Sequence, residues 1–308
     1  MCVVVQRNRY AVLTGTLDIR VGLRHLDSDA RAVWQQRLDD AETSRPADFQ
    51  NNGWVVSALQ AAWSAIATTP VPEDDLSSEV FRADHLRLAL DAVVRAGFDT
   101  DTVAAIAGGL LGAAHGASAV PLEWRALLHG WPGMSARGLT ALARQIARGG
   151  KPDHFDAHYP GYRTGALALH PFDDGVLLGG IGALRDLPAG VDAVVSLCRI
   201  GDDDVRRDIP HVEVRLIDRP DADENPHLDF VLLEAVKAVE RFRHDGRTVL
   251  VHCVEALSRT PTVGALYGAR LRGVSADEAL RAVQDVLPSA SLNLAFREAL
   301  QRMMSGKN

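Results

Sequence analysis

The sequence has few cysteines, no excess of basic charge and no long apolar run. Its three cysteines, Cys2, Cys198 and Cys253, are irregularly spaced, so they predict no disulfide framework and favour a reducing, cytoplasmic compartment. Acidic residues (40) outnumber basic ones (33) and give a formal charge of −7, which argues against nucleic acid and anionic membranes as partners. No apolar run approaches the length of about 18 residues that a membrane span needs.

Length and breaker residues predict two domains. The chain has 308 residues, which is too long for one average domain and suits two of about 150 residues each. A stretch rich in glycine and proline at residues 149–161 separates two halves with different apolar patterns. We therefore predict one domain over residues 1–155 and a second over residues 156–308.

The N-terminal half has the apolar spacing of helices. Residues 54–66 form one amphipathic stretch that ends before Pro70. A second stretch at residues 86–94 is stopped by Gly97, and a third spans about 102–114. These patterns predict an all-α N-terminal region, and a packed helical core accounts for most of its residues without any function.

The C-terminal half alternates between strand and helix patterns. Short apolar runs of strand length occur at residues 175–180, 191–198 and 248–251, and residues 212–217 alternate between apolar and charged side chains, as in a half-exposed strand. An amphipathic helix is expected at residues 228–242. This alternation predicts an α/β domain with a mostly parallel central sheet flanked by helices.

Residues 249–262 have the pattern of a strand, a loop and a helix that starts near Pro261. In such a loop, successive backbone N–H groups point into one concavity and bind a dianion. Cys253 stands first in the loop, where that field favours its thiolate. Arg259 follows six residues later, where its planar guanidinium can grip two phosphate oxygens.

We therefore predict Cys253 as a nucleophile and Arg259 as a phosphate clamp. The alternative is a buried structural thiol and a surface charge, but the apolar strand, the adjacent His252 and the following helix all coincide with the functional interpretation. Cys198 has none of this context and is predicted to be a core residue. The remaining phosphate-binding residues of the loop would be Val254, Glu255, Ala256, Leu257, Ser258 and Thr260.

Residues 252–260 read His-Cys-Val-Glu-Ala-Leu-Ser-Arg-Thr and resemble the signature His-Cys-x-x-Gly-x-x-Arg-Ser/Thr of the dual-specificity branch of the protein tyrosine phosphatases. The resemblance extends over about residues 165–305. It implies that Cys253 attacks phosphorus to form a cysteinyl-phosphate, which water hydrolyses without a cofactor. It also implies that Thr260 stabilises the leaving thiolate and that His252 orders the loop.

The resemblance further implies an aspartic acid that protonates the leaving oxygen and then activates water. Asp218, Asp221 and Asp223 are candidates, and Asp218 is preferred because it directly follows a predicted strand. Ala256 stands where the family has glycine. If this position needs a positive φ, alanine there costs about 1 kcal/mol relative to glycine. Glu255 disfavours polyanionic substrates, so a phosphorylated protein or a small phosphoester is the expected partner. No sequence feature indicates an oligomeric state.

Residues 97–102 read Gly-Phe-Asp-Thr-Asp-Thr at the entry to a predicted helix. Two carboxylates at this spacing could hold a hard divalent ion, or Asp99 or Asp101 could cap the helix. The segment is similar to the ADP-ribosylglycohydrolases over about residues 10–145, which implies that Asp99, Asp101 and Thr102 would be magnesium ligands. The acidic segments with which the first half of that family completes its metal site are not present, so the predicted site is incomplete.

The leading hypothesis is a phosphoprotein phosphatase, specific for tyrosine, serine/threonine or both, fused to a partial ADP-ribosylglycohydrolase-like region. That region would be either a truncation of a longer protein or a scaffold. One alternative is a magnesium-dependent ADP-ribosyl hydrolase in a full-length form. Another is a non-catalytic module that binds phosphate.

Overall fold

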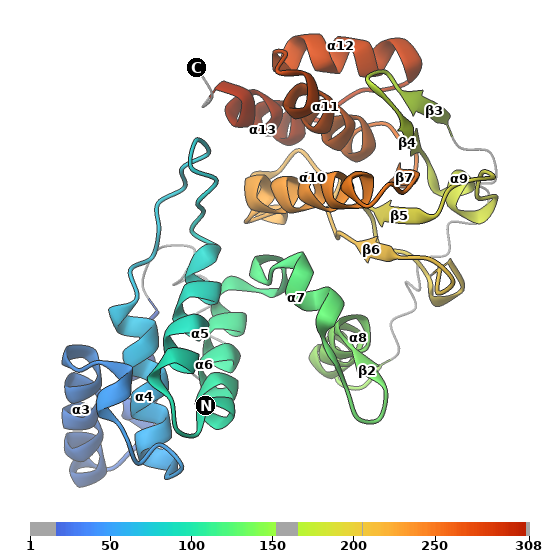
Figure 1. Ribbon diagram of the computed structural model, residues 1–308. Coiled ribbons are helices and arrows are strands. Elements are labelled where there is room, and N and C mark those ends of the chain that lie inside the picture. The colour runs from blue at the N-terminus through green and yellow to red at the C-terminus, as the bar shows by residue number, and fades with distance from the viewer. Residues whose placement is uncertain (1–16, 152–165, 205, 306–308) are drawn as a thin grey trace. The chain divides into compact units, whose positions relative to one another are not determined.

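The computed structural model describes residues 17–151, 166–204 and 206–305 (Figure 1). The chain divides into two compact units, Met1–Val120 and Pro121–Asn308. The first unit is helical, and the second contains a five-stranded, mostly parallel sheet with helices, as the sequence predicted. No helix within the described ranges is long and apolar enough to cross a membrane.

The described part of the first unit consists of four α-helices and three short 3-10 helices. The three predicted helices are confirmed as α4, α5 and α6, and α3 lies in the region predicted to be helical, although no separate helix was predicted there. The bounds are η1 Ile19–His25, α3 Ser28–Thr43, η2 Pro46–Asp48, α4 Val55–Thr68, α5 Asp84–Ala96, α6 Thr100–His115 and η3 Ala117–Ala119.

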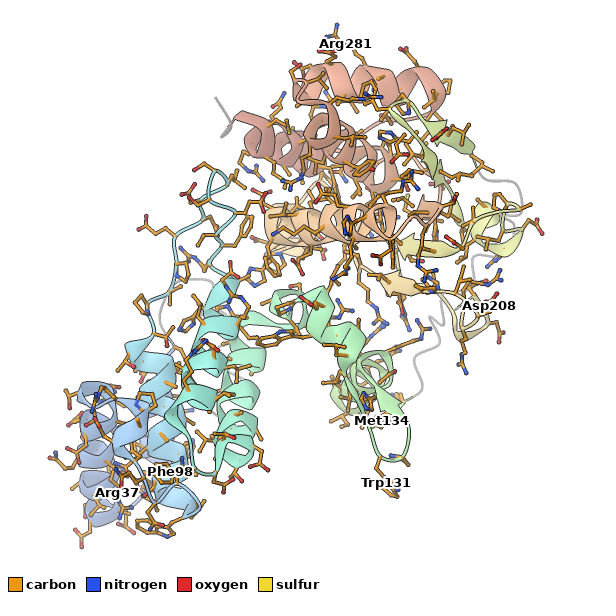
Figure 2. All side chains as sticks on the ribbon, viewed as in Figure 1. Arg37, Phe98, Trp131, Met134, Asp208 and Arg281 are labelled. Carbon is orange, nitrogen blue, oxygen red and sulfur yellow. The ribbon has the colours of Figure 1, made fainter. Side chains whose placement is uncertain are left out.

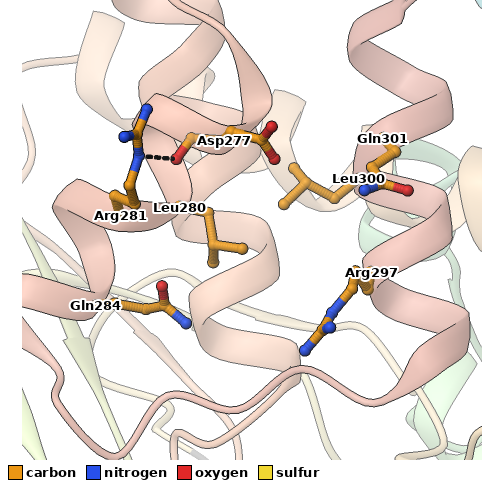
Figure 3. A pocket seen from close by; sticks show the side chains of 7 residues that line it. All are labelled: Asp277, Leu280, Arg281, Gln284, Arg297, Leu300 and Gln301. Atoms are coloured by element: carbon orange, nitrogen blue, oxygen red, sulfur yellow. Dashed lines mark hydrogen bonds between the residues drawn. The ribbon is translucent and has the colours of Figure 1, made fainter.

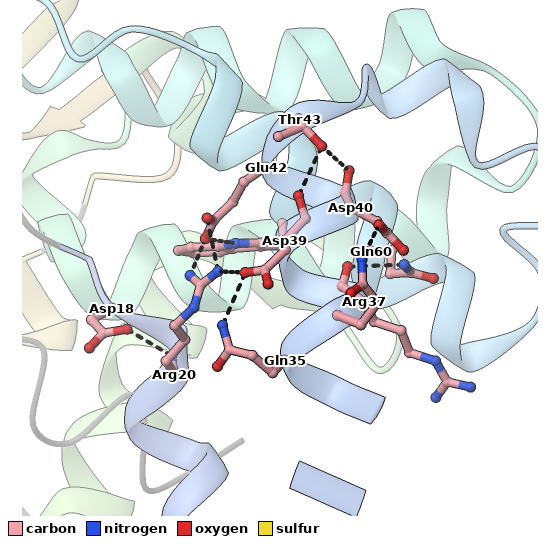
Figure 4. A network of polar contacts seen from close by, with 11 residues as sticks. Asp18, Arg20, Gln35, Arg37, Asp39, Asp40, Glu42, Thr43 and Gln60 are labelled. Atoms are coloured by element: carbon pink, nitrogen blue, oxygen red, sulfur yellow. Dashed lines mark hydrogen bonds and ion pairs between the residues drawn. The ribbon is translucent and has the colours of Figure 1, made fainter. Parts of the chain in front are cut away.

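A polar network ties η1 to α3 and α4 in this unit (Figure 4). The guanidinium of Arg20 binds Asp39 at 2.5 Å and both carboxylate oxygens of Glu42. Trp63 on α4 donates its indole N–H to Glu42 at 2.9 Å. The hydrogen bonds from Arg20 are the main reason that the pKa of Glu42 lies below its usual value, so this carboxylate stays ionised where it joins three elements.

The second unit begins with α7 Leu122–Leu127, a short hairpin of β1 His129–Gly130 and β2 Met134–Ser135, and α8 Ala136–Ala147. Trp131 at the hairpin turn is 93% exposed (Figure 2). The backbone N–H of Leu122 donates to Glu234 at 2.9 Å, and Arg137 pairs with Glu213.

These contacts hold residues 121–147 against the α/β unit, whereas the predicted domain bounds place them in the N-terminal region. Their apolar spacing identifies helices but carries no information about which core those helices join. The predicted boundary between residues 155 and 156 lies outside the described residues.

The central sheet has the strand order β3-β4-β7-β5-β6. Strand β7 pairs in parallel with β4 and β5, β5 pairs in parallel with β6, and β3 runs antiparallel to β4. All residues of β5 and β7 are buried, as expected for strands covered on both faces. The bounds are β3 Leu167–His170, β4 Asp173–Gly179, β5 Ala193–Ser196, β6 His211–Glu213 and β7 Val249–His252.

Helices α10 and α11 pack on the sheet, and α12 and α13 pack on α11 (Figure 1). An added Cβ at Gly264 would lie 2.9 Å from Leu178 of β4, so glycine allows α11 to approach that strand closely. The helices are α9 Ile181–Arg185, α10 Leu228–His244, α11 Arg259–Arg272, α12 Ala276–Val286 and α13 Leu294–Ser305, with short 3-10 turns η4 Asp202–Asp204 and η5 Ala222–Glu224.

One predicted strand is shorter than expected. The sequence predicted a strand over residues 212–217, but β6 ends at Glu213. The N–H of Val214 still donates to Ser196 at 2.7 Å, and Ser196 is the last residue of the neighbouring strand. After Val214 the chain leaves the sheet. The carbonyl of Leu216 accepts a hydrogen bond from the guanidinium of Arg259 at 3.0 Å and does not pair with a neighbouring strand.

Candidate active site

The candidate nucleophile lies at the end of the central strand. Cys253 directly follows β7 and is 1% exposed. Its backbone N–H donates to the carbonyl of Gly179 at 3.4 Å, which anchors it to the end of β4. The loop that follows leads into α11 at Arg259. The strand, loop and helix predicted from the sequence are therefore present.

The carbonyl groups of the loop are held on its outer side. The carbonyl of Val254 accepts from Ile181, and that of Leu257 accepts from Ser291. The carbonyl of Cys253 accepts from the ring of His252 at 3.1 Å. Because N–H and C=O point in opposite directions across a trans peptide, the N–H groups that follow these carbonyls point the other way, toward the inside of the loop.

Within the described residues, the backbone N–H groups of 254–258 donate to no carbonyl or side chain. Unpaired N–H donors gathered in one loop at a helix N-terminus form an anion-binding concavity. This arrangement has the donor set that a phosphate group needs.

Arg259 is 8% exposed and is held by the strand ends beside the loop. Its Nη1 donates to the carbonyls of Leu216 at 3.0 Å and Leu197 at 3.4 Å. Its Nε lies 3.3 Å from a carboxylate oxygen of Asp218, but the N–H is not directed at that oxygen. Within the described residues, this buried N–H therefore has no hydrogen-bond acceptor. The fixed guanidinium keeps a donor for an incoming oxyanion.

The structure brings only one of the three candidate acids to this site. Asp218 lies beside Arg259 and accepts from the side-chain amide of Asn293 at 2.7 Å. Asp221 and Asp223 are exposed in the turn that follows, where Asp221 accepts the N–H of Asp223.

A role for Asn293 was not predicted from the sequence. Its carbonyl oxygen accepts the N–H of Phe296 at 3.1 Å, which caps α13. An asparagine before an apolar helical run is a recognisable cap signal. That signal does not indicate that the amide NH₂ group of the same side chain donates a hydrogen bond to Asp218.

A chain of hydrogen bonds fixes the tautomers of two buried histidines. The N–H of Arg206 can only donate, so Nδ1 of His211 accepts at 3.0 Å and its Nε2 carries the proton. The carbonyl of Cys253 can only accept, so Nδ1 of His252 is protonated and its Nε2 accepts. The hydroxyl of Ser196 lies between them, 2.7 Å from His211 and 2.5 Å from His252.

Both rings are neutral because burial lowers the pKa of His211 and of His252 to about 4. The chain crosses strands β6, β5 and β7 and ends on the carbonyl of Cys253. His252 therefore orders the first peptide of the loop, and Ser196 and His211, which the sequence analysis did not single out, hold His252.

Three further residues clarify the roles expected from the sequence. The hydroxyl of Thr260 donates to the carbonyl of Gly179 at 3.2 Å and not to the sulfur of Cys253. Ala256 has a φ of +58°, in the left-handed region. Cys198 is fully buried, and that burial raises the pKa of its thiol to about 12, which makes it a core residue and a poor nucleophile.

A cavity of about 550 Å³ lies between α12 and α13. Asp277, Arg281 and Arg297 line it together with aliphatic and amide side chains (Figure 3). None of the catalytic candidates lines this cavity, so we do not connect it with the loop chemistry.

The candidate magnesium ligands lie at the start of α6 in the first unit. Asp99 caps the helix by accepting the N–H of Thr102 at 3.4 Å. A hydrogen bond with Asp99 is the main cause that lowers the pKa of Asp101. Within the described residues, no third acidic, histidine or cysteine side chain joins them. Asp99, Asp101 and Thr102 therefore remain the predicted ligands of an incomplete magnesium site.

A parallel sheet, a cysteine at the end of its central strand and an anion-binding loop closed by arginine define the class of cysteine-dependent phosphatases. Residues 189–305 match the family model of the dual specificity phosphatase catalytic domain, and residues 4–154 match that of ADP-ribosylglycohydrolase. Both matches agree in kind and order with the resemblances in the sequence.

Curated relatives that this chain resembles bear the names of dual specificity phosphatases. Dual specificity phosphatase 28 of Mus musculus is 31% identical over 114 residues, which cover 37% of this chain and 68% of the relative. Dual specificity protein phosphatase 1 of Arabidopsis thaliana is 31% identical over 94 residues, which cover 30% and 46%. The crystal structure of human DUSP28 aligns with a TM-score of 0.39 and 25% identity, over 46% of this chain and 95% of that one.

The chain belongs to the dual specificity phosphatase family. It spans only part of several curated relatives, including 22% of the dual specificity protein phosphatase Mpk3 of Drosophila melanogaster.

Proposed function

We propose that the second unit hydrolyses phosphate monoesters through a cysteinyl-phosphate intermediate. The observation that carries the proposal is the loop after β7, whose N–H groups and Arg259 Nε lack acceptors within the described residues. These donors match the oxygens of a phosphoryl group, and they belong to the residues that directly follow Cys253 in the chain.

In the first step, the thiolate sulfur of Cys253 bonds to phosphorus as the P–O bond of the ester breaks. The carboxyl group of Asp218 gives its proton to the departing oxygen. In the second step, water attacks phosphorus, the S–P bond breaks and the carboxylate of Asp218 takes a proton from that water. Asn293 holds Asp218, and Arg259 stabilises the charge on the equatorial oxygens. The protein supplies every group in this scheme, and no cofactor takes part.

The proposed substrate is phosphotyrosine or phosphoserine/threonine in a protein. Glu255 is exposed in the loop, so its charge disfavours substrates with several neighbouring phosphates. A reducing cytoplasmic location would keep Cys253 as a free thiol, and Cys198 and Cys253 are both free in the structure.

The test is hydrolysis of an aryl phosphate by the full chain. Cys253→Ser and Arg259→Met are expected to abolish turnover, and vanadate is expected to block the unmodified protein. Cys198→Ser is the matched control and is expected to retain turnover, because that thiol takes no part in the reaction. Turnover that survives Cys253→Ser would refute the proposal.

A second candidate is a module that binds phosphate without turnover. Two observations favour it: the strained backbone at Ala256, and the Thr260 hydroxyl that is engaged with Gly179. The same assay separates the two functions, because tight binding of a phosphopeptide without release of phosphate would support the second.

A further inference from the structure

A second cavity, of about 250 Å³, lies entirely within the second unit. One wall comes from α7, the β1–β2 hairpin and α8, and the other comes from β6 and residues beside it. Arg125 and Arg137 contribute from the first wall, and His211, Glu213 and Arg215 contribute from the second. The first wall lies outside residues 189–305, which match the phosphatase family.

The lining of this cavity carries an excess of positive charge. Three guanidinium groups accompany one carboxylate, that of Glu213. His211 does not add a charge at neutral pH, because burial lowers its pKa to about 4. The carboxylate of Glu234 accepts the N–H of Leu122 on the first wall, but Glu234 does not line the cavity.

Glu213 is shared by two of the three arginines. Arg137 pairs with one of its oxygens, and Nε of Arg215 lies 3.2 Å from the other. Arg137 also donates to the carbonyl of Ile200 at 2.9 Å. Each carboxylate oxygen of Glu213 therefore already binds one arginine, and neither of these two arginines is Arg125.

Arg125 differs from the other two arginines in its contacts. Within the part of the chain that the structure describes, it forms no hydrogen bond and no salt bridge. Burial and then the nearby charge of Arg215 lower the pKa of Arg125, while Glu213 acts in the opposite direction. A half-buried cation beside another cation is unfavourable unless an anion joins them.

We propose that this cavity binds one phosphate-sized oxyanion, with Arg125 and Arg215 as its principal donors. The planar fork of a guanidinium suits the oxygens of phosphate. Sites for drug-sized ligands occupy roughly 300–1,000 Å³, so a cavity of about 250 Å³ suits a single anionic group. That group is either free inorganic phosphate or a phosphoryl group carried by a substrate.

The first experiment measures inorganic phosphate binding by calorimetry on the full chain. Arg259→Met serves as the background, because it weakens anion binding at the catalytic loop. Adding Arg125→Gln is expected to weaken the remaining binding at least tenfold. The control is Arg207→Gln, which removes the same charge from an exposed site outside the cavity lining and is expected to change binding less than twofold.

Glu213→Gln provides a test that misfolding cannot imitate. It removes the carboxylate that competes with the anion, so phosphate is expected to bind at least threefold more tightly. A disrupted fold would weaken binding instead. The proposal is overturned if no binding remains in the Arg259→Met background, if Arg125→Gln and Arg207→Gln have equal effects, or if Glu213→Gln weakens binding.

A second arm distinguishes the two sources of the anion, using peptides with one or two phosphates and the Cys253→Ser chain. If a substrate phosphoryl group enters the cavity, Arg125→Gln weakens binding of the doubly phosphorylated peptide only. If the occupant is free phosphate, Arg125→Gln leaves both peptides unaffected while calorimetry still detects phosphate. None of these measurements requires turnover, so they succeed or fail independently of the proposed phosphatase activity.

Discussion

At the scale of single residues, Ala256 shows how one departure from the family signature acts. Its φ of +58° is strained for any residue with a Cβ. Ala256→Gly is therefore expected to raise the free energy of unfolding by about 0.5–1 kcal/mol, because relief of strain exceeds the added entropy of the unfolded chain. Urea unfolding measures this change.

The control for this substitution is Ala282→Gly within α12. That position has ordinary helical geometry, so glycine there is expected to lower stability by about 1 kcal/mol. If both substitutions destabilise the protein equally, the left-handed conformation of Ala256 is not a source of strain.

Asp218 and Asn293 are also to be tested one residue at a time. Asp218→Asn removes the proposed proton donor and is expected to lower kcat about 100-fold for phosphotyrosine, within the usual range of 10²–10⁴ for such groups. The loss is expected to be smaller for an aryl phosphate whose leaving group needs no proton. Steady-state kinetics with the two substrates measure the difference.

Asn293→Ala is expected to reproduce this pattern more weakly, with a larger effect on kcat than on KM, because Asn293 positions Asp218. Asp221→Asn is the matched control, since Asp221 is exposed and contacts its own turn. A larger loss of kcat for Asp221→Asn than for Asp218→Asn would show that Asp218 is not the proton donor.

At the scale of elements, the sequence predicted what depends on local pattern. Strands β4, β5 and β7 and helix α10 were predicted because buried apolar runs and helical spacing are visible in a few consecutive residues. The end of β6 was not predicted, because it depends on where β5 stops and on the hydrogen bond that Arg259 donates to the carbonyl of Leu216. The same limit applies to the site: a local motif contains Cys253 and Arg259, whereas His211 and Asn293 reach it from distant elements.

The hydrogen-bond chain across β6, β5 and β7 predicts a dependence of stability on pH. The pKa of His211 and of His252 is lowered to about 4 in the folded state, against about 6.5 when unfolded. The unfolded state therefore binds more protons as pH falls from 6.5 to 4, and stability is lost across that window. His211→Gln is expected to make the decline in thermal midpoint shallower.

Thermal unfolding between pH 7 and pH 4.5 measures this slope. His244→Gln removes an exposed imidazole from the end of α10 and serves as the control. Parallel curves for the unmodified protein and His211→Gln would show that burial of this ring does not contribute.

At the scale of the whole molecule, two divisions of the chain do not coincide. The ADP-ribosylglycohydrolase match covers residues 4–154, whereas the first compact unit ends at Val120. Residues 121–147 thus match one family and pack against the domain of the other. Contacts to Glu234, Glu213 and Ile200 explain this, because each is a hydrogen bond or ion pair with the phosphatase unit.

If these contacts stabilise the phosphatase unit, a fragment of residues 121–308 should be more stable than one of residues 166–308. Three polar contacts of about 1 kcal/mol each correspond to a thermal midpoint higher by roughly 6–12 °C in a unit of this size. Arg137→Met in the longer fragment is expected to remove part of that difference, and Arg207→Met is expected to remove none. Equal thermal midpoints for the two fragments would mean that residues 121–147 lie on the phosphatase unit without stabilising it. In that case, the role of these residues would be to form one wall of the arginine-lined cavity.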